Sequence, residues 1–441
     1  MDIDTLVSAE WIIPVEPRGA VLSGQALAID AGRIVALLPA DEAAARYRPR
    51  ARVDLPGHAL IPGLVNAHTH AAMTLLRGYA DDLPLERWLN DHIWPAERAF
   101  AGADFVRDGA RLACAEMLTG GVTCCNDMYF FPGETAAAAI EAGMRVVVGL
   151  IVIGFPSPWA GDIDDHFERG LAVHDRLRHE PLVTTCFAPH APHTVPEAGL
   201  LRVARLAEEL DLPITMHVHE TAAEVREALA RDGARPLRRL EALGLLSPRL
   251  LAVHATQVDD GDIDLLARYG VTVVHCPESN LKLASGLCPV ARLQAAGVNV
   301  ALGTDGAASN NDLDMIGEMR TAALLAKAVA GDPTALPAAD ALAMATLAGA
   351  RALGLEARVG SLVAGKEADM VAVRLDGLSH QPVWDPLSHL VYATARSDVA
   401  RVWVAGRPVV VDGVPLRLDR EDLSRRAAEW RTRIAAGRAG G

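Results

Sequence analysis

The chain is poor in lysine, in aromatic residues and in long apolar runs. Its only lysines are Lys282, Lys327 and Lys366, so arginine carries almost all of the positive charge. The net charge is −14 and basic residues form no run, which argues against a nucleic acid or an anionic membrane as partner. No apolar run approaches the ~20 residues of a membrane span. Residues 1–4 are acidic and lack the features of a secretion signal.

Cysteine is also scarce. The chain has six cysteines, and none of them form a C-x-x-C pair. Most lie in apolar segments, which predicts reduced, buried thiols and excludes a disulfide framework or a zinc finger. We therefore expect a cytoplasmic protein.

The length of 441 residues and a hydrophobic content of 51% predict more than one domain. The pattern of the first sixty residues predicts short strands, with a hairpin turn at Asp30-Ala31-Gly32. From residue 59 apolar strands alternate with amphipathic helices, the helices being expected at 104–119, 134–142, 197–210, 222–231 and 260–268. The expected strands are 60–67, 121–128, 145–153, 182–189, 213–219, 250–255, 271–276 and 298–304.

Eight such units predict an α/β fold, a (β/α)8 TIM-like barrel over residues 59–358. A doubly wound open sheet is the alternative, but no glycine-rich dinucleotide fingerprint follows any strand. A helical stretch is expected at 338–353, after which short strands return. We expect residues 1–58 and 359–441 to form one small β-sandwich domain, with a charged amphipathic helix at 421–437.

Histidine and acidic residues gather where the predicted strands end. In a parallel barrel these ends meet on one face, where catalytic groups collect. His68 and His70 alternate along the first strand and so point to the same side. The other strand-end candidates are His190 and His193 on the fourth strand, His217, His219 and Glu220 on the fifth, His254 on the sixth, His275 on the seventh and Asp305 on the eighth.

Several neutral imidazoles with one carboxylate suit zinc or a related divalent ion. A catalytic ion lowers the pKa of a bound water from about 15.7 towards ~7. A carboxylate that is not a ligand is then needed to move protons. Glu220, three residues after His217, is placed for that task.

Ordered motifs extend this pattern along most of the chain. They are PGLVNAHTH at 62–70, WLNDHIWPAE at 88–97, FAPHAPHTV at 187–195, MHVHE at 216–220, VHATQ at 253–257, HCPESNLKLASG at 275–286 and LGTDGAASNN at 302–311. With these motifs the chain resembles the amidohydrolase superfamily. Within it, the chain is similar to deaminases of 5′-methylthioadenosine, S-adenosylhomocysteine and adenosine, a group related to chlorohydrolases.

The resemblance implies a role for each matched residue. It implies one divalent ion, zinc or else Fe²⁺, bound by His68, His70, His217 and Asp305. It implies that Asp305 also takes a proton from the bound water, that Glu220 protonates the ring nitrogen beside the attacked carbon, and that His254 orients or deprotonates the nucleophile. Glu97 would accept hydrogen bonds from the ribose hydroxyls, and His190 would contact the nucleoside.

Some of these positions have a second interpretation. Glu97 could be a helix-capping acid and His190 a packed core histidine. His219 shares the face of His217, so spacing alone allows either to be the ligand. Trp88 could wall the purine or fill the core, whereas His193 and His275 are expected to be structural. Ser279, Asn280 and Lys282 are expected to shape the loop after the seventh strand.

We expect hydrolytic deamination at C6 of an adenine nucleoside by a homo-oligomer, a dimer or a tetramer. The alternative is an amidohydrolase that acts on guanine, a pterin or an s-triazine; a catalytically silent binding protein is the rival of another class. The 5′ substituent stays open, although the apolar Phe155 and Trp159 favour methylthioadenosine.

The shortage of lysine predicts the number of metal ions. Two-metal members of the superfamily bridge their ions with a carbamylated lysine on the fourth strand, but no lysine precedes Lys282. We therefore expect one ion per chain when the purified protein is analysed by plasma mass spectrometry. A value near two ions would contradict a mononuclear site.

Overall fold

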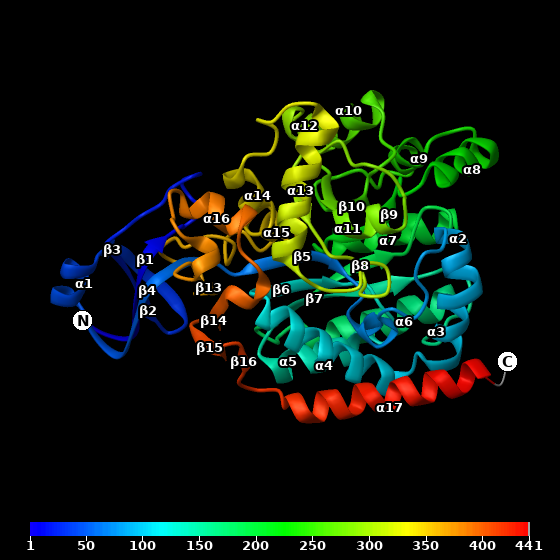
Figure 1. Cartoon of the computed structure of the whole chain (residues 1–441). Helices are drawn as coiled ribbons and strands as arrows, with labels where there is room; N and C mark the ends of the chain where they lie inside the picture. The colour runs from blue at the N-terminus through cyan, green and yellow to red at the C-terminus, as the bar shows by residue number, and fades with distance from the viewer. Residues whose placement is uncertain (440–441) are drawn as a thin grey trace. The chain divides into compact units, whose positions relative to one another are not determined.

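The computed structural model describes residues 1–439 and contains two eight-stranded sheets (Figure 1). The chain divides into two compact units. One comprises residues 1–66, 115–124 and 314–417, and the other comprises residues 67–114, 125–313 and 418–441. The domain boundaries expected at 58/59 and 358/359 stay predictions.

One sheet is the predicted barrel. Its strands are parallel and follow one another in chain order, and the sheet nearly closes because the Asp305 N–H donates to the His68 carbonyl at 3.0 Å. The fold class predicted from the alternating pattern is thereby confirmed. The strands are β5 (Leu64–Thr69), β6 (Val122–Asp127), β7 (Arg145–Val152), β8 (Val183–Pro189), β9 (Ile214–Val218), β10 (Leu250–His254), β11 (Thr272–His275) and β12 (Val300–Leu302).

The first barrel strand differs from its predicted span of 60–67. The apolar run there belongs to two strands, because β4 (Arg48–Pro62) ends at Pro62 and β5 starts at Leu64. Residues 58–62 of β4 pair antiparallel with β13 (Met370–Arg374), and Gly63 separates the two strands. Hydrophobicity alone does not reveal this break because both strands are buried.

Helices follow the barrel strands in the predicted alternation. The 338–353 stretch, however, is two helices divided at Thr346, whose hydroxyl donates to the Leu342 carbonyl at 2.6 Å. The helices are α4 (Ala103–Thr119), α5 (Pro132–Ala142), α6 (Ile163–Leu177), α7 (Glu197–Glu209), α8 (Ala222–Asp232), α9 (Pro236–Ala242), α10 (Asp260–Tyr269), α11 (Pro277–Lys282), α12 (Val290–Ala295), α13 (Met315–Ala330), α14 (Ala338–Met344), α15 (Leu347–Ala352) and α16 (Pro386–Tyr392).

The second sheet joins both ends of the chain, as predicted. Its order is β16-β15-β14-β13-β4-β1-β2-β3, and the expected hairpin turn joins β2 to β3 with Ala31 and Gly32 at positive φ. Val7, Leu27 and Trp403 are buried in its core. The remaining strands are β1 (Asp2–Ile12), β2 (Gln25–Asp30), β3 (Arg33–Pro39), β14 (Val399–Val404), β15 (Arg407–Val411) and β16 (Val414–Pro415), with α1 (Ala40–Arg46) after β3.

The connection from β5 to α4 is long and mostly helical. It contains η1 (Ala71–Leu76), α2 (Leu85–Arg87), the π-helical turn η2 (Trp88–Ile93) and α3 (Trp94–Phe100). Single π-helical turns occur often at functional sites. This segment carries the WLNDHIWPAE motif, so the motif lies on helical turns beyond the first barrel strand.

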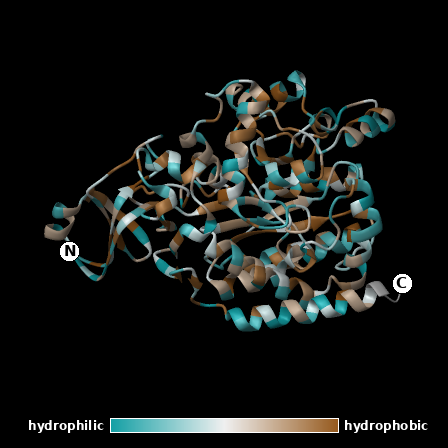
Figure 2. Cartoon of the chain, in the orientation of Figure 1, coloured by the Kyte–Doolittle hydropathy of each residue, from teal (hydrophilic) through white to brown (hydrophobic). Residues whose placement is uncertain are grey.

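The expected C-terminal helix is α17 (Arg420–Ala439), which runs alongside α4 (Figure 1). The Trp430 indole N–H donates to Asp108 at 2.9 Å, and the Trp430 ring packs edge-on against Phe105. Figure 2 shows the contrast between the mostly hydrophobic barrel strands and the largely hydrophilic α17. Within residues 420–437 of α17, Leu423, Trp430 and Ile434 are buried and most of the other side chains are exposed.

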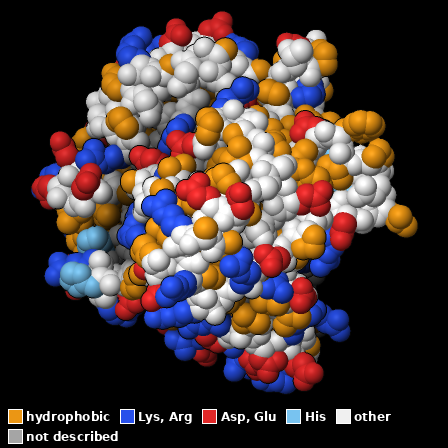
Figure 3. Space-filling view, turned by 90° about the vertical axis from the view of Figure 1, so that its left-hand side faces the viewer, with side chains coloured by type: hydrophobic (Ala, Val, Ile, Leu, Met, Phe, Trp, Pro, Cys, Tyr) orange, Lys and Arg blue, Asp and Glu red, His pale blue; other side chains and the backbone are white. Residues whose placement is uncertain are grey.

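None of the helices in residues 1–439 combines the length and the apolar character that crossing a bilayer requires. All six cysteines are buried and free of disulfides, as predicted. On the face drawn in Figure 3, both basic and acidic side chains occur. Two short 3-10 turns, η3 (Leu378–His380) and η4 (Arg396–Asp398), complete the described elements.

Gly109 lets α4 approach the turn that follows His70. A Cβ atom at Gly109 would lie 2.9 Å from the Ala72 Cα and would collide with the Ala72 carbonyl. Gly109→Ala should therefore lower the free energy of unfolding by about 1–3 kcal/mol in urea titrations. At an exposed helix position the same substitution would be stabilising, because alanine has a higher helix propensity than glycine. Gly102→Ala, with no atom within 4 Å of the new methyl, is the matched control. A stabilised Gly109→Ala protein would contradict this packing.

Candidate functional site

Four predicted ligands converge at the ends of the barrel strands. His68 lies on β5, His70 directly follows it, His217 lies on β9, and Asp305 follows β12. One donor atom from each lies within 4.8 Å of all the others. The His70 Nε2 is 3.1 Å from Asp305 Oδ1, and the His68 Nε2 is 3.5 Å from the same oxygen.

Backbone carbonyls orient two of these imidazoles. The Nδ1 atoms of His70 and His217 lie 2.5 and 2.9 Å from the carbonyl oxygens of Met128 and His190. Each Nδ1 therefore carries the proton, and each Nε2 presents a lone pair to the centre. Such outer contacts are typical of histidines that bind a metal.

The electrostatics of the group fit a cation. Burial lowers the pKa of His68 to about 4 and that of His217 well below its ordinary value, so both are neutral donors. Burial also opposes a charge on His70, but the Asp305 carboxylate outweighs it and raises the pKa of His70 to about 9. A divalent ion would replace that proton. Three imidazoles and one carboxylate are a donor set that suits zinc, so the residues present fit the expected ion.

The two oxygens of Asp305 have different neighbours. Oδ1 faces the histidines, whereas Oδ2 accepts hydrogen bonds from the hydroxyls of Ser279 and Ser309 at 2.7 and 2.8 Å. The two hydroxyls hold the Asp305 side chain in one rotamer, in which Oδ1 faces the three histidines. Ser279 was expected only to shape its loop, and Ser309, in the LGTDGAASNN motif, was not singled out.

Glu220 and His254 lie beside this group. The Glu220 Oε2 is 3.9 Å from the His254 Nε2, and burial raises the pKa of Glu220. The His254 Nδ1 lies 2.9 Å from the Asn280 Oδ1, so Nδ1 carries the proton and Nε2 is free to accept one. The His254 ring stacks on His217 with centroids 5.3 Å apart and 17° between planes.

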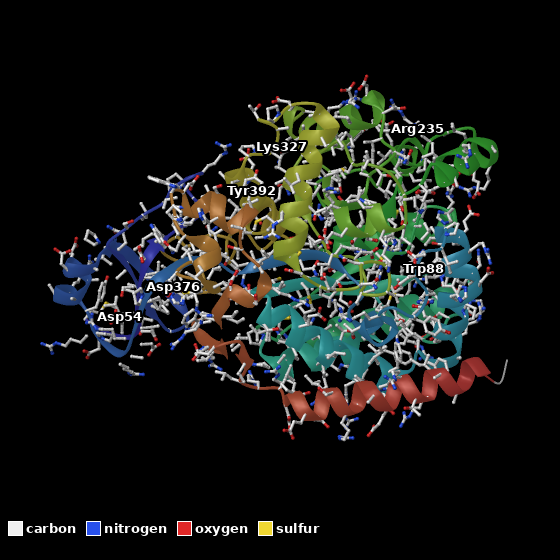
Figure 4. All side chains as sticks on the ribbon, in the orientation of Figure 1. Asp54, Trp88, Arg235, Lys327, Asp376 and Tyr392 are labelled. Atoms are coloured by element: carbon white, nitrogen blue, oxygen red, sulfur yellow. The ribbon has the colours of Figure 1, made fainter. Side chains whose placement is uncertain are left out.

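A cavity of about 310 Å³ opens onto these residues. Glu97 and Trp88 line it, Trp88 (labelled in Figure 4) also packing in the apolar cluster around Phe105. Trp88 thus fills the core and also lines the cavity, while its contact with a purine stays a prediction. Burial raises the pKa of Glu97 to about 7 and, with the Glu97 charge nearby, raises that of Tyr129 well above its ordinary value.

The predicted nucleoside-contacting His190 also lines the cavity. Its ring lies 5.1 Å from that of His217, its Nδ1 is 3.1 Å from the Thr194 hydroxyl oxygen, and burial lowers its pKa to about 3. His190 is therefore neutral. Its backbone carbonyl, as noted, orients His217, a contact that sequence reasoning missed because it involves no side chain of His190.

The ambiguity at His219 is resolved by its contacts. Its Nε2 accepts the Leu237 N–H at 3.2 Å, and its Nδ1 lies 3.1 Å from the Gln257 carbonyl. Arg235 (Figure 4) donates to the same carbonyl and to Asp262. Both ring nitrogens of His219 are thus engaged away from the ligand group, which leaves His217 as the donor from β9.

The other residues considered in the sequence differ in their burial and in their distance from the cavity. His275 is buried, whereas His193 lines the cavity wall. Lys282 binds Asp81 at 2.7 Å and so ties the loop after β11 to the loop after η1. Trp159, expected near the 5′ substituent, is instead buried against His166 at 5.5 Å and is not among the residues that line the cavity.

A barrel that presents three imidazoles, a carboxylate and a separate acid in one buried cavity has the architecture of a metal-dependent hydrolase. The amidohydrolase family profile matches residues 59–409. The chain belongs to the amidohydrolase family, and the resemblance seen in its motifs is confirmed.

Several relatives are similar over the whole chain. A protein from Teredinibacter turnerae named 5-methylthioadenosine/S-adenosylhomocysteine deaminase is 48% identical and is covered, like this chain, over 99% of its length. One of the same name from Saccharophagus degradans is 48% identical, with 99% of this chain and 98% of that protein covered.

Solved structures have the same fold. An adenosine deaminase from Xanthomonas campestris with bound zinc has a TM-score of 0.98 and 53% identity over 99% of each chain. The zinc complex of the atrazine chlorohydrolase TrzN from Arthrobacter aurescens has a TM-score of 0.90 and 25% identity, covering 97% of this chain and 99% of that one.

The two serines that hold Asp305 should affect metal retention. Replacing both Ser279 and Ser309 by alanine removes the hydrogen bonds to Oδ2 and should weaken metal affinity about 10–100-fold. The measurement is zinc retained against a competing chelator, which needs no substrate. Ser285→Ala, at a buried serine with no described hydrogen bond to Asp305, should retain zinc like the parent protein. Unchanged affinity in the double variant would contradict this role.

Proposed function

We propose that the chain is a hydrolytic deaminase of adenine nucleosides. Water attacks C6, the bond from C6 to the amino nitrogen breaks, and an inosine-type product and ammonia leave. The observation that carries the proposal is the pairing of Glu220 and His254, 3.9 Å apart, beside the four-residue ligand group. The names of the full-length relatives support the same chemistry.

Glu220 is the proposed acid/base. Its burial raises its pKa, so the carboxyl group holds a proton closer to neutral pH than an exposed glutamate does. It delivers that proton to N1 of the purine, which makes C6 a better electrophile. The proton that Asp305 takes from the water then passes to the amino group, ammonia departs, and the remaining hydroxyl proton returns to Glu220 as the C6 carbonyl forms.

A divalent ion bound by His68, His70, His217 and Asp305 supplies a nucleophilic water of lowered pKa. Asp305, through Oδ1, takes a proton from the attacking water. His254 orients that water through Nε2, because its Nδ1 is engaged with Asn280. His254 then assists the departure of ammonia.

Glu97 is the proposed ribose contact. It lies on α3 and lines the cavity, and the residue is 9% exposed, beside Tyr129. Such a buried acid favours a ligand that donates hydrogen bonds, as a pair of vicinal hydroxyls does. His190, neutral at pH 7, contacts the nucleoside from the other side of the ligand group.

The 5′ substituent is proposed to be small and uncharged. Phe155 lines the cavity and lies 6.5 Å from the Trp94 ring, so this wall is apolar. We therefore place 5′-methylthioadenosine ahead of S-adenosylhomocysteine and adenosine. This preference rests on Phe155 and Trp94, because Trp159 does not reach the cavity.

The metal, the assembly and the location complete the proposal. The donor set favours one zinc ion per chain, with Fe²⁺ as the alternative. The protein is proposed to act on a small molecule, without nucleic acid or membrane, as a homo-oligomer. The six buried cysteines, none of which forms a disulfide, support a location in the reducing cytoplasm.

The rival reaction uses the same ligand group on another heterocycle, such as guanine, a pterin or an s-triazine. The structural similarity to the chlorohydrolase favours this rival only at the level of the fold. Glu97 separates the two, because a buried acid in the cavity serves a substrate that carries sugar hydroxyls.

Ammonia release tests the proposal directly. The zinc-loaded protein is assayed with 5′-methylthioadenosine, S-adenosylhomocysteine, adenosine, adenine and guanine. We expect kcat/KM for at least one adenine nucleoside to exceed that for either free base. A preference for adenine or for guanine would contradict the assignment, as would faster release of chloride from an added chlorotriazine.

The Glu97→Ala variant is the matched control for this assay. It should lower kcat/KM for nucleosides by a factor of about 10–1,000, the cost of losing a charged hydrogen-bond acceptor. The residual rate with free bases should change little. An equal loss for both substrate types would mean that Glu97 does not contact the ribose.

A further inference from the structure

The backbone of the turn that carries Glu220 is hydrogen-bonded on both sides. His219 has φ = 57°, in the left-handed region that non-glycine residues rarely adopt, and there the chain leaves β9. The His219 carbonyl accepts the N–H groups of Thr256 and Gln257 at 3.0 and 3.1 Å. The Glu220 carbonyl accepts the Thr256 hydroxyl at 2.6 Å.

Glu224, on the first turn of α8, binds the other side of this turn. Its Oε1 accepts the His219 N–H at 3.1 Å, and its Oε2 accepts the Glu220 N–H at 2.6 Å. One carboxylate thus engages two consecutive backbone donors. Together with Thr256 and Gln257 it leaves none of the four backbone polar groups of His219 and Glu220 without a partner.

This arrangement departs from an ordinary helix cap. Thr221 is the N-cap of α8, and its hydroxyl accepts the Glu224 N–H at 3.1 Å. In a capping box the glutamate three residues on returns to the N–H of the N-cap itself. Here the Glu224 carboxylate reaches one and two residues further back, to the turn that carries the proposed acid/base.

The Glu220 side chain is held much less tightly than its backbone. The nearest polar contacts of its carboxyl group among the described residues are Ser285 Oγ at 3.5 Å and the His254 Nε2 at 3.9 Å. The position of the carboxyl group therefore depends on where the backbone holds the Cα atom. A loose side chain on a fixed backbone suits a group that moves a proton between two atoms.

We propose that Glu224 is a positioning residue for deamination, which fixes the turn at His219 and Glu220 so that the Glu220 carboxyl group lies between His254 and the substrate. The inference rests on the proposed function of Glu220. Glu224 does not touch the reacting atoms and acts only through the backbone of its neighbour.

The cost of the Glu224 site supports a role beyond helix capping. Glu224 lies close to a second carboxylate, Glu220, and burial raises its pKa to about 7. The Asp162 cap of α6 does the simpler task from the surface, accepting the Asp165 N–H at 2.9 Å. Glu224 is half-buried and also lines the cavity, and an acid beside a like charge is an unfavourable helix cap, so its placement is explained by the two N–H groups that it holds.

A double-mutant cycle tests the inference. Glu224→Ala should lower kcat about 10–100-fold with little change in KM, since small misplacement of a reacting group is costly. Zinc content should stay at the parent value. Glu220→Gln alone should retain zinc and lower kcat by about 10²–10⁴. Adding Glu224→Ala to Glu220→Gln should cost nothing more, because Glu224 acts through Glu220.

Two further variants distinguish a loss of positioning from a general loss of stability. Glu224→Gln keeps one acceptor oxygen and should retain more activity than Glu224→Ala. Asp162→Ala removes an ordinary cap, worth about 0.5–2 kcal/mol, and should lower the melting temperature without changing kcat. Losses that multiply in the double variant, or an unchanged kcat in both Glu224 variants, would overturn the inference.

Hydrogen exchange separates this inference from the proposed function. In the parent protein the amides of residues 219 and 220 should exchange slowly, and in Glu224→Ala they should exchange at least tenfold faster at equal global stability. This measurement needs no substrate. Unchanged exchange overturns the positioning role even if deamination is observed, whereas an inactive parent protein overturns only the proposed reaction.

Discussion

The buried carboxylate of Asp305 is the constraint on which the site depends. A carboxylate this far from water is unfavourable unless cationic groups and hydrogen-bond donors surround it. Here two imidazoles meet Oδ1 and two serine hydroxyls meet Oδ2. His70 and His217 are oriented by backbone carbonyls, so their lone pairs converge where a cation would balance the charge. The barrel makes this possible because it brings eight strand ends to one face.

Two kinds of support surround this centre. His70 and His217 of the ligand group are held by backbone carbonyls that follow other barrel strands, Met128 after β6 and His190 after β8. The proposed proton-transfer groups are held by the helices that follow the strands, through Asn280 of α11 at His254 and Glu224 of α8 at Glu220. The carbonyls determine which nitrogen of each histidine presents a lone pair to the centre. The helices determine where the proposed proton-transfer groups lie.

The sequence was sufficient to predict whatever follows from periodicity. Strand and helix alternation predicted the barrel, and the two-residue repeat placed His68 and His70 on one side. The repeat failed to separate His217 from His219 because it applies only inside a strand. β9 ends at Val218, and the positive φ of His219 turns its ring towards Leu237. Contacts between residues far apart in the sequence, such as Ser279 with Asp305, have no local pattern at all.

The His190 carbonyl separates two properties of this protein. It orients His217 whatever side chain residue 190 carries, while the imidazole of the same residue lines the cavity. A different side chain at residue 190 would thus change which substrates the cavity accepts. The backbone carbonyl that orients His217 would remain. Because the side chain and the carbonyl of one residue have separate roles, related barrels can diverge in substrate range while the metal-binding geometry stays the same.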